Sequence, residues 1–122
     1  MTTELRDLAD EDFCYLTTTG RVTGRPHTIE IWFALDGRTL YMLSGGGRRA
    51  DWVKNLLRAP AVLVRIKGHT FAGQARIVEQ PAEDTLARRL VVGKYQPRYH
   101  GDLTDWGRTA LPVAVEFAPA SD

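Results

Sequence analysis

Cysteine is nearly absent from this sequence, and its scarcity excludes two kinds of site. Cys14 is the single cysteine among 122 residues, so no disulfide can form within the chain and no cysteine cluster can bind a metal. The three histidines, His27, His69 and His100, are dispersed and do not show the spacing of metal ligands, so we expect no metal site. Cys14 lies in an apolar stretch without an adjoining cation, which predicts a buried small hydrophobe rather than a nucleophile.

The chain also lacks a strong excess of either charge. It has 16 Lys and Arg against 15 Asp and Glu, a formal net charge of +1, which disfavours nucleic acid as a partner and gives no general attraction to a membrane surface. No apolar run is long enough to span a bilayer, and the first residues lack the basic start and apolar run of a signal peptide. We therefore expect a cytoplasmic protein without stable membrane insertion.

Length and apolar patterning predict one compact domain over residues 1–122. Stretches rich in β-branched and aromatic residues, bounded by turn residues, indicate strands at residues 13–19, 27–35, 39–44, 61–66, 70–79 and 111–117. Two helices are expected, one over residues 51–58 with Asp51 as its N-cap and one from Pro81 to about Gly93. Residues 95–109 are polar and aromatic, which favours an irregular loop.

Short links between the expected strands determine how they pair. Asp36-Gly37 is a typical hairpin turn, and Lys67-Gly68-His69 joins the next two strands. Such links demand antiparallel pairing, which excludes a doubly wound parallel sheet. The chain is therefore predicted to be mainly β with helices (α+β), built as a small closed or split antiparallel β-barrel with helices over its openings.

The turn after the first expected strand gathers groups that suit an anion. Hydroxyls, free backbone N–H groups and cations meet there, and arginine matches the geometry of phosphate and carboxylate better than lysine does. The residues concerned are Thr18, Thr19, Gly20, Arg21, Thr23, Gly24, Arg25 and His27. The alternative is a hairpin loop whose arginines are merely solvated.

A second basic turn precedes the helix expected over residues 51–58. It comprises Ser44, Gly45, Gly46, Gly47, Arg48 and Arg49. The glycines leave backbone N–H groups unshielded and allow the close approach of a ring or phosphate, although the spacing is neither that of a Walker loop nor that of a dinucleotide fingerprint. The alternative is a flexible connector. In the helix itself, we expect Trp52 to be a core anchor rather than a stacking platform and Asn55 to tie down a loop backbone.

Three stretches together resemble a known family of oxidoreductases. The turn of residues 16–28, with its Thr-Gly-Arg-x-Thr-Gly-x-Pro motif, is followed by the glycines of residues 44–47 and by Asp-Trp-Val-Lys-Asn-Leu-Leu at residues 51–57. Their order and spacing are similar to those of the deazaflavin-dependent nitroreductases. These belong to the split-barrel flavin and deazaflavin oxidoreductases, which include pyridoxamine phosphate oxidases.

The resemblance implies a split barrel of the FMN-binding type that holds 8-hydroxy-5-deazaflavin, coenzyme F420. It implies hydride transfer from the reduced coenzyme to an activated nitro compound, quinone or enone. Arg21, Arg25 and His27 would meet the phosphate or glutamate tail. Ile29, Glu30, Ile31 and Trp32 would line the ring. Residues 44–47 would approach the phosphodiester or ring edge, with Arg48 and Arg49 nearby.

The proton that completes such a reduction needs a donor. Tyr95 and Tyr99 lie where the family places tyrosines, and we expect them to line the substrate side and to donate. The alternative is a surface loop with packed tyrosines. Trp106 is expected to cover a barrel end rather than to form a substrate wall, and Glu30, if it faced the interior, would need an arginine partner.

The chain departs from the family in places that leave other functions open. It lacks a Lys-His-Pro insertion before Trp52, and Val53 replaces a tyrosine. FMN is therefore an alternative cofactor, in an oxidase or reductase with the same barrel. A barrel that sequesters a flavin, haem or lipid without turnover is the non-enzymatic alternative. The small size of the chain favours a homodimer.

Overall fold

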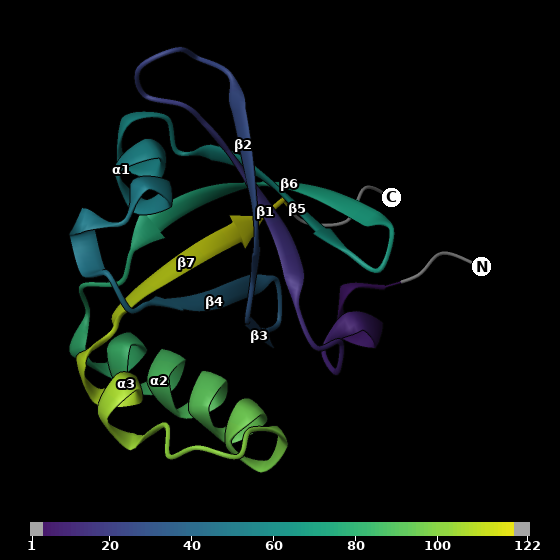
Figure 1. The fold of residues 1–122 in the computed structure, drawn as a ribbon. Helices are drawn as coiled ribbons and strands as arrows, with labels where there is room; N and C mark the ends of the chain where they lie inside the picture. Colours follow the sequence, from purple (N-terminus) through teal and green to yellow (C-terminus); the bar gives the residue numbers. More distant parts are fainter. Residues whose placement is uncertain (1–3, 119–122) are drawn as a thin grey trace.

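A computed structural model describes residues 4–118 of the chain (Figure 1). The strands are β1 (Cys14–Thr19), β2 (Pro26–Ile31), β3 (Ala34–Asp36), β4 (Thr39–Ser44), β5 (Ala61–Ile66), β6 (His69–Ile77) and β7 (Leu111–Phe117). The α-helices are α1 (Asp51–Arg58), α2 (Pro81–Tyr95) and α3 (Thr104–Thr109). Short 3₁₀ helices occupy η1 (Leu5–Leu8), η2 (Gly47–Arg49) and η3 (Gln96–Arg98).

The strands form one seven-stranded sheet in the order β2-β1-β5-β6-β7-β4-β3. Neighbouring strands pair antiparallel, as the short links predicted. The two edge strands, β2 and β3, are consecutive in the chain, and only Trp32 and Phe33 separate them. The sheet therefore curls until its edges nearly meet, and the barrel is split between β2 and β3. The predicted α+β split barrel is confirmed.

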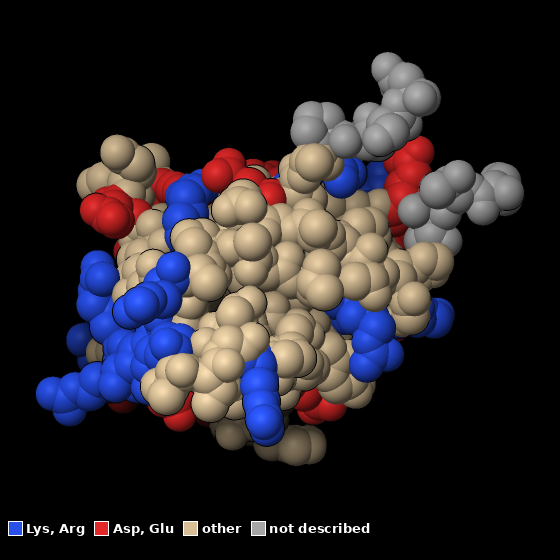
Figure 2. Space-filling model, turned by 90° about the horizontal axis from the view of Figure 1, so that it is seen from above, with Lys and Arg blue, Asp and Glu red and all other residues tan. Residues whose placement is uncertain are grey.

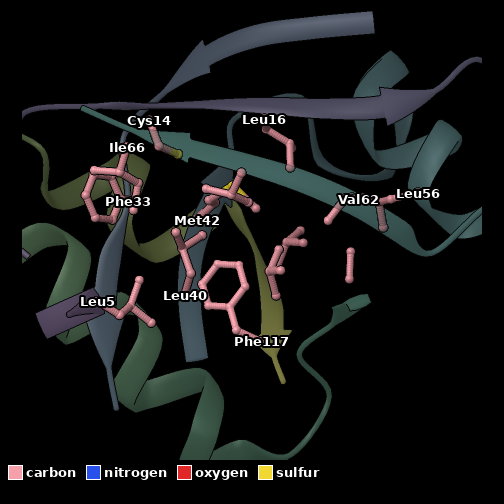
Figure 3. Close-up of a cluster of buried hydrophobic side chains, with 14 of the residues drawn as sticks. Leu5, Cys14, Leu16, Phe33, Leu40, Met42, Leu56, Val62, Ile66 and Phe117 are labelled. Atoms are coloured by element: carbon pink, nitrogen blue, oxygen red, sulfur yellow. The ribbon is translucent and has the colours of Figure 1, made fainter. Parts of the chain in front are cut away.

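The inside of the curled sheet holds the main core. Leu16, Phe33, Met42 and Val64 are all fully buried there, and Figure 3 shows such side chains converging from both halves of the sheet. Cys14 also lies in this core and is fully buried, as expected. Burial raises the pKa of its thiol to about 12, so the thiolate is disfavoured.

A second core lies on the outside of β4 and β7, where α2 packs. Tyr41 and Leu43 from β4 meet Ala87 and Val91 from α2. The strand β7 is consequently buried on both faces, and its central residues Val113 to Val115 are all inaccessible. By contrast, β5 alternates between buried and exposed residues, because α2 and α3 lie on the opposite side of the barrel (Figure 1).

Three predicted element boundaries were wrong, each because a tertiary contact outweighed a local signal. The strand expected over residues 27–35 breaks at Trp32 and Phe33, since the chain must cross there from one edge of the sheet to the other. Asp51 is the first residue of α1 and not its N-cap, which is Ala50. Helix α2 passes through Gly93 to Tyr95, because Val91 and Tyr95 anchor its last turn in the second core.

The expected loop at residues 95–109 contains η3 and α3. The Asp102 carboxylate accepts hydrogen bonds from the backbone N–H and the hydroxyl of Thr104, which fixes the start of α3. Gly107 lets α3 pack on α2, because a Cβ at this position would overlap the side chain of Val92. The polar composition of the segment hid this packing from the sequence pattern.

Glu83 connects α2 to the sheet, and this connection predicts acid sensitivity. Arg76 donates two hydrogen bonds to its carboxylate at 2.7 and 2.8 Å, and the Tyr41 hydroxyl donates a third at 2.7 Å. The hydrogen bonds from Arg76 are the main reason why the pKa of Glu83 falls from 4.5 to about 2. The pKa of this carboxyl is lower in the folded chain than in the unfolded chain, so its ionised form stabilises the fold at pH values above 4.5. This stabilisation is lost as the pH falls from 4.5 toward 2.

We expect Glu83→Gln to reduce the free energy of unfolding by about 1–2 kcal/mol at neutral pH and by much less near pH 3. Urea unfolding at the two pH values measures the difference. The exposed Glu79 supplies the control, since Glu79→Gln should leave both values unchanged. An equal loss of unfolding free energy at both pH values would show that the ion pair between Arg76 and Glu83 is not the cause of the loss.

Candidate functional site

The turn between β1 and β2 is fastened to α1 through Asn55. The Asn55 side-chain oxygen accepts hydrogen bonds from the backbone N–H of Arg21 at 3.1 Å and from its guanidinium Nη1 at 2.9 Å. The amide nitrogen of Asn55 donates to the hydroxyl of Thr18 at 3.2 Å. Asn55 is only 4% exposed, so its polar atoms are satisfied entirely within this junction. The prediction that Asn55 ties down a loop backbone is confirmed.

Arg21 is held by the protein through both ends of its guanidinium. Besides the bond to Asn55, its Nη2 lies 3.1 Å from the carboxylate of Asp51. Asp51, predicted as a helix cap, thus forms an ion pair with the turn instead. Much of the hydrogen-bonding capacity of Arg21 is used in orienting the turn, and Arg21 is a positioning residue as well as a candidate ligand for an anion.

A cavity of about 450 Å³ lies where this turn, β2 and α1 meet. Its lining mixes polar and apolar side chains. The residues are Thr18, Gly20, Arg21, Val22, Thr23, His27, Thr28, Ile29, Asp51, Trp52 and Asn55. Trp52 is half-buried and packs on the core, as expected, and it also forms part of this wall. A cleft of this size and mixed lining is typical of a small-molecule site.

The turn has a shape that only glycine permits at one position. A Cβ on Gly20 would lie 2.7 Å from Nε2 of His27 and 3.0 Å from the carbonyl oxygen of Arg25. The backbone N–H of Gly20 donates to that carbonyl at 2.7 Å, and Gly24 has a φ of +75°, which other residues adopt only with strain. The turn therefore presents the His27 ring to the cavity, while Arg25 lies exposed on its outer side.

A smaller cavity of about 250 Å³ follows further along β2. Glu30, Ile31 and Trp32 line one side, and Leu43 and Trp106 line the other. Two aromatic rings meet edge to face here, since Trp106 stands nearly perpendicular to Trp32 at a centroid distance of 5.7 Å. Trp106 therefore forms a wall of this cavity, and whether that wall contacts a substrate stays a prediction. The Glu30 carboxylate itself is exposed, next to the Tyr15 hydroxyl at 3.4 Å.

The glycine turn lies beside Trp106 and outside the larger cavity. A Cβ on Gly45 would be 3.4 Å from Nε1 of Trp106, so this close approach requires a small residue. Ser44 is buried, and its hydroxyl donates to the carbonyl of Gly47 at 3.0 Å, which closes the turn. Ser44 thus shapes the turn from beneath and does not face the cavity.

Basic side chains gather on the side of the molecule that carries these turns. Arg48 and Arg49 are exposed in η2, immediately before α1, and Lys54 and Arg58 are exposed on α1. Figure 2 shows Lys and Arg concentrated on this side. The site is therefore electropositive although the whole chain is close to neutral, and it favours an anionic ligand.

The two predicted tyrosines occupy different environments. Tyr95 is 2% exposed, stacks on Trp32 at 4.4 Å, and its hydroxyl accepts from the N–H of Phe33 and donates to the carbonyl of Asp12 at 2.8 Å. Burial raises the pKa of Tyr95 to about 12. This placement argues against the predicted role of Tyr95 as a proton donor. Tyr99 is 49% exposed and touches Trp32 edge-on at 5.6 Å, so its hydroxyl remains accessible.

The remaining predicted residues divide between the site and its surroundings. Thr19 faces away from the site and lines a separate cavity on the outside of β1, whereas Gly24, Gly46 and Gly47 supply turn geometry. Sequence reasoning missed Leu43, Val22 and Thr28, because nothing in their local pattern distinguishes them from ordinary strand or loop residues. Within residues 4–118, no group of His, Cys, Asp and Glu could hold a metal ion, and no helix is long and apolar enough to cross a membrane.

Solved structures with the same fold include F420 reductases and a candidate oxidase. The structure of an F420-H2-dependent reductase is 20% identical and superposes with a TM-score of 0.69, covering 86% of this chain and 94% of the other. A candidate pyridoxamine 5′-phosphate oxidase from Listeria innocua is 19% identical, with a TM-score of 0.68 and coverages of 94% and 90%. A chain described as a domain-swapped dimer is 21% identical, with a TM-score of 0.68 and coverages of 86% and 80%.

A comparison at the level of the family is more specific than these likenesses, which at such identities show the fold alone. The sequence-family model of the F420H2-dependent quinone reductases matches residues 2–118 of this chain. This range includes both basic turns, β2 and the aromatic cluster around Trp32. Coenzyme F420 is accordingly the cofactor, and the function is that of an F420-dependent oxidoreductase. The chain belongs to the F420H2-dependent quinone reductase family.

Proposed function

We propose that this protein transfers a hydride from reduced coenzyme F420 to a small activated acceptor, namely a quinone, a nitro compound or an enone. The observation that carries the proposal is the succession of two cavities along β2. The first lies between a hydrogen-bonded turn and α1 on the electropositive side of the molecule. The second is smaller and is lined by Trp32, Trp106 and aliphatic side chains. This arrangement suits an anionic cofactor beside a planar apolar acceptor.

The residues of the first cavity fit the chemistry of the cofactor. Its acidic tail calls for cations and hydrogen-bond donors, which His27 supplies in the cavity lining and which Arg25, Arg48 and Arg49 supply on the exposed surface outside it. Arg21 would face the same tail while Asn55 and Asp51 hold the turn. The apolar side chains of Ile29 and Ile31, half-buried along β2, would support the ring. When bound, the deazaflavin supplies the hydride, and the protein contributes orientation and electrostatics.

The second cavity fits the acceptor and the proton that it needs. Trp106 and Leu43 would hold a flat ring against β2 and exclude water from it. A quinone that has received a hydride needs one proton to become a hydroquinone. Tyr99 is the accessible phenol of the aromatic cluster, and we assign it the role of delivering that proton, directly or through a water molecule.

The proposal is tested by pairing a binding measurement with a turnover measurement. Fluorescence titration with oxidised F420, run beside FMN, should show saturable binding of F420 and weaker binding of FMN. Oxidation of reduced F420 should then depend on added menadione, nitroaromatic or cyclic enone, with at least one acceptor turned over. Preferential binding of FMN would transfer the protein to the flavin branch of the fold. F420 binding without turnover of any acceptor would indicate a sequestering protein and contradict the proposed reaction.

Substitution of the two tyrosines should separate catalysis from packing. Tyr99→Phe is expected to lower kcat by about tenfold to hundredfold with unchanged stability, because only a proton donor is removed. Tyr95→Phe is expected to cost about 1–3 kcal/mol of stability, because the N–H of Phe33 and the carbonyl of Asp12 lose a buried partner. Stopped-flow turnover and urea unfolding of both variants provide the two readouts. The reverse pattern would restore Tyr95 as the donor.

We also propose that the protein is a homodimer. Every second residue of β5 is exposed in the described part of the chain, and a protein of the same fold is described as a domain-swapped dimer.

A further inference from the structure

The chain crosses between the two edge strands at Trp32 and Phe33, and this crossing forms one wall of the smaller cavity. Trp32 lines the cavity together with Trp106. The Trp32 ring also stacks on Tyr95 at 4.4 Å and meets Tyr99 edge-on at 5.6 Å. A displacement of the crossing would therefore move the ring against which the proposed acceptor lies.

Two consecutive residues at the end of α2 hold the backbone of this crossing. The N–H of Phe33 donates to the Tyr95 hydroxyl at 3.1 Å, and the carbonyl of Phe33 accepts a hydrogen bond from Nζ of Lys94 at 2.9 Å. Phe33 is fully buried, so neither backbone group can turn to water instead. Of these two contacts, only the one from Lys94 is charged.

The ammonium of Lys94 contacts the crossing in a second way. Its Nζ lies 3.7 Å from the centroid of the Phe33 ring and 5.0 Å from that of the Tyr95 ring, distances at which a cation is attracted to the face of an aromatic ring. In the part of the chain that the structure describes, Lys94 forms no ion pair, and the nearby carboxylate of Asp12 is paired with Arg98 at 2.8 Å. The carbonyl and the two rings are therefore the groups that hold this charge.

The charge of Lys94 changes in the mildly alkaline range. Its pKa falls from 10.5 to about 8, chiefly because burial disfavours the charged form and next because Arg98 lies nearby. Asp10, Cys14 and Asp12 act in the opposite direction. Lys94 lines a cavity of about 430 Å³ together with Asp10 and Arg98, through which the amine can exchange protons with solvent.

Keeping an ammonium at this position costs stability. An amine whose pKa is lower in the folded chain than in the unfolded chain opposes folding while it is protonated, and this cost disappears as the pH rises from about 8 to 10.5. Methionine would provide a similar apolar stem without the cost. A charge that is retained against stability, in contact with the wall of a cavity, indicates a functional position.

We propose that Lys94 is a positioning residue for the reduction, because its ammonium fixes the carbonyl of Phe33 and thereby keeps Trp32 in place against the acceptor. The inference rests on the proposed function and adds a residue to it. Lys94 lies outside the lining of both cavities of the site. Loss of its charge should therefore raise the KM for the acceptor and leave the affinity for F420 unchanged.

Steady-state kinetics with menadione at saturating reduced F420 test this role. Lys94→Met should raise the KM for menadione by about tenfold at neutral pH, with a smaller change in kcat, because the unpaired carbonyl of Phe33 lets the crossing shift. Lys94→Arg keeps a charged donor and should recover most of the loss. Arg89→Met is the matched control, since it removes one charge from the exposed side of the same helix, and it should leave the KM unchanged.

The pH profile gives a readout that a merely structural role would not move. In the wild type, the KM for menadione should rise between about pH 7 and pH 9, as Lys94 loses its proton. Lys94→Arg should keep a low KM throughout, because arginine does not titrate in this range, and Lys94→Met should keep a high one. If Lys94→Met fails to fold, as judged by circular dichroism, the comparison of wild type with Lys94→Arg still decides the question.

Nuclear magnetic resonance of the cofactor-free protein tests the same contact without turnover. The backbone amide signal of Phe33 and the indole N–H signal of Trp32 should shift with a midpoint near pH 8, and Lys94→Arg should abolish the shift. Signals that stay still through this range would overturn the inference whatever the reaction is. Shifting signals with an unchanged KM in Lys94→Met would reduce Lys94 to a structural contact. A wild type that turns over no acceptor would overturn the proposed reaction and with it this role in catalysis, while the titration still decides whether Lys94 holds the crossing.

Discussion

Replacing Asn55 with leucine should weaken the binding of F420 by about tenfold to hundredfold while the barrel remains folded. Asn55 is buried and joins Thr18 on β1 to Arg21 in the hairpin turn. Leucine has the same branched arrangement of heavy atoms, although its methyl groups are bulkier, but it cannot donate or accept, so the N–H of Arg21 and the hydroxyl of Thr18 would lose their partner. Each unsatisfied buried group costs about 1–3 kcal/mol, and the chain can avoid this cost by releasing the turn from α1 into water.

Release of the turn would open the larger cavity, because one of its walls is the turn itself. F420 binding would then have to restore the order of the turn, and the free energy of binding would become less favourable by the free energy that this ordering requires. Fluorescence titration measures the affinity, and urea unfolding measures the loss of stability. Leu57→Ala, an uncharged change at a 49% exposed position of the same helix, is the control. Asp51→Asn removes only an exposed ion pair and should change affinity by less than about threefold.

A large loss of stability with unchanged affinity would contradict this role for Asn55. It would mean that the turn keeps its position without the helix. In contrast, reduced affinity accompanied by a sensitivity of the turn to proteolysis would support the role directly. Arg21, which precedes Val22 in the turn, offers a cleavage site for trypsin once the turn is released, and protection by F420 should be lost together with the affinity.

Most strands could be predicted because their local signals agree with their tertiary environment. The stretches 39–44, 61–66 and 111–117 have in the structure the bounds that the sequence indicated. Turn residues or a proline stop the pattern at both ends of the first two stretches, and Pro119 follows the third. Helix α1 also has the predicted bounds, because Pro60 prevents its continuation. At these positions, a residue's neighbours along the chain carry enough information.

The errors in the predicted elements arise where neighbouring residues make contacts with different distant parts of the chain. The alternation of residues 27–35 is unbroken in the sequence, yet β2 pairs with β1 whereas β3 pairs with β4. No local pattern reports which partner a strand has. Tyr95 is different, because a signal was available. Ala87, Val91 and Tyr95 are spaced by four and lie on one face of α2, but Gly93 and the polar neighbours Lys94 and Gln96 concealed it.

The types of residue that form the site could be predicted, but its separation into two cavities could not. Both basic turns were assigned to one anion site, whereas only the hairpin turn lines the larger cavity. The glycine turn lies beside Trp106, more than 50 residues away along the chain. The ion pair of Arg21 with Asp51 likewise joins two segments that the sequence treats as separate motifs. Such contacts depend on the closure of the barrel and cannot be inferred from either motif.

The combined variant Arg25→Ala, Arg48→Ala and Arg49→Ala should weaken F420 binding by about a hundredfold at low ionic strength. These three arginines are exposed around the site, where each opposite charge at the ligand contributes about 1 kcal/mol or slightly less. Arg21 is left in place because its guanidinium holds the turn. The fold should be unaffected, since exposed charges contribute little to stability.

Salt distinguishes the role of these arginines from that of the turn. Wild-type affinity should fall as salt is added, because exposed charges are screened, while the triple variant should bind weakly and almost independently of salt. Asn55→Leu should keep the wild-type salt dependence despite its lower affinity, since it disturbs the shape of the site and not its charge. A control variant with Lys67, Arg89 and Arg108 changed to alanine loses the same charge elsewhere on the surface. If that control weakened F420 binding as much as the site variant, the basic turns would contribute only through net charge, and the tail would have to bind elsewhere.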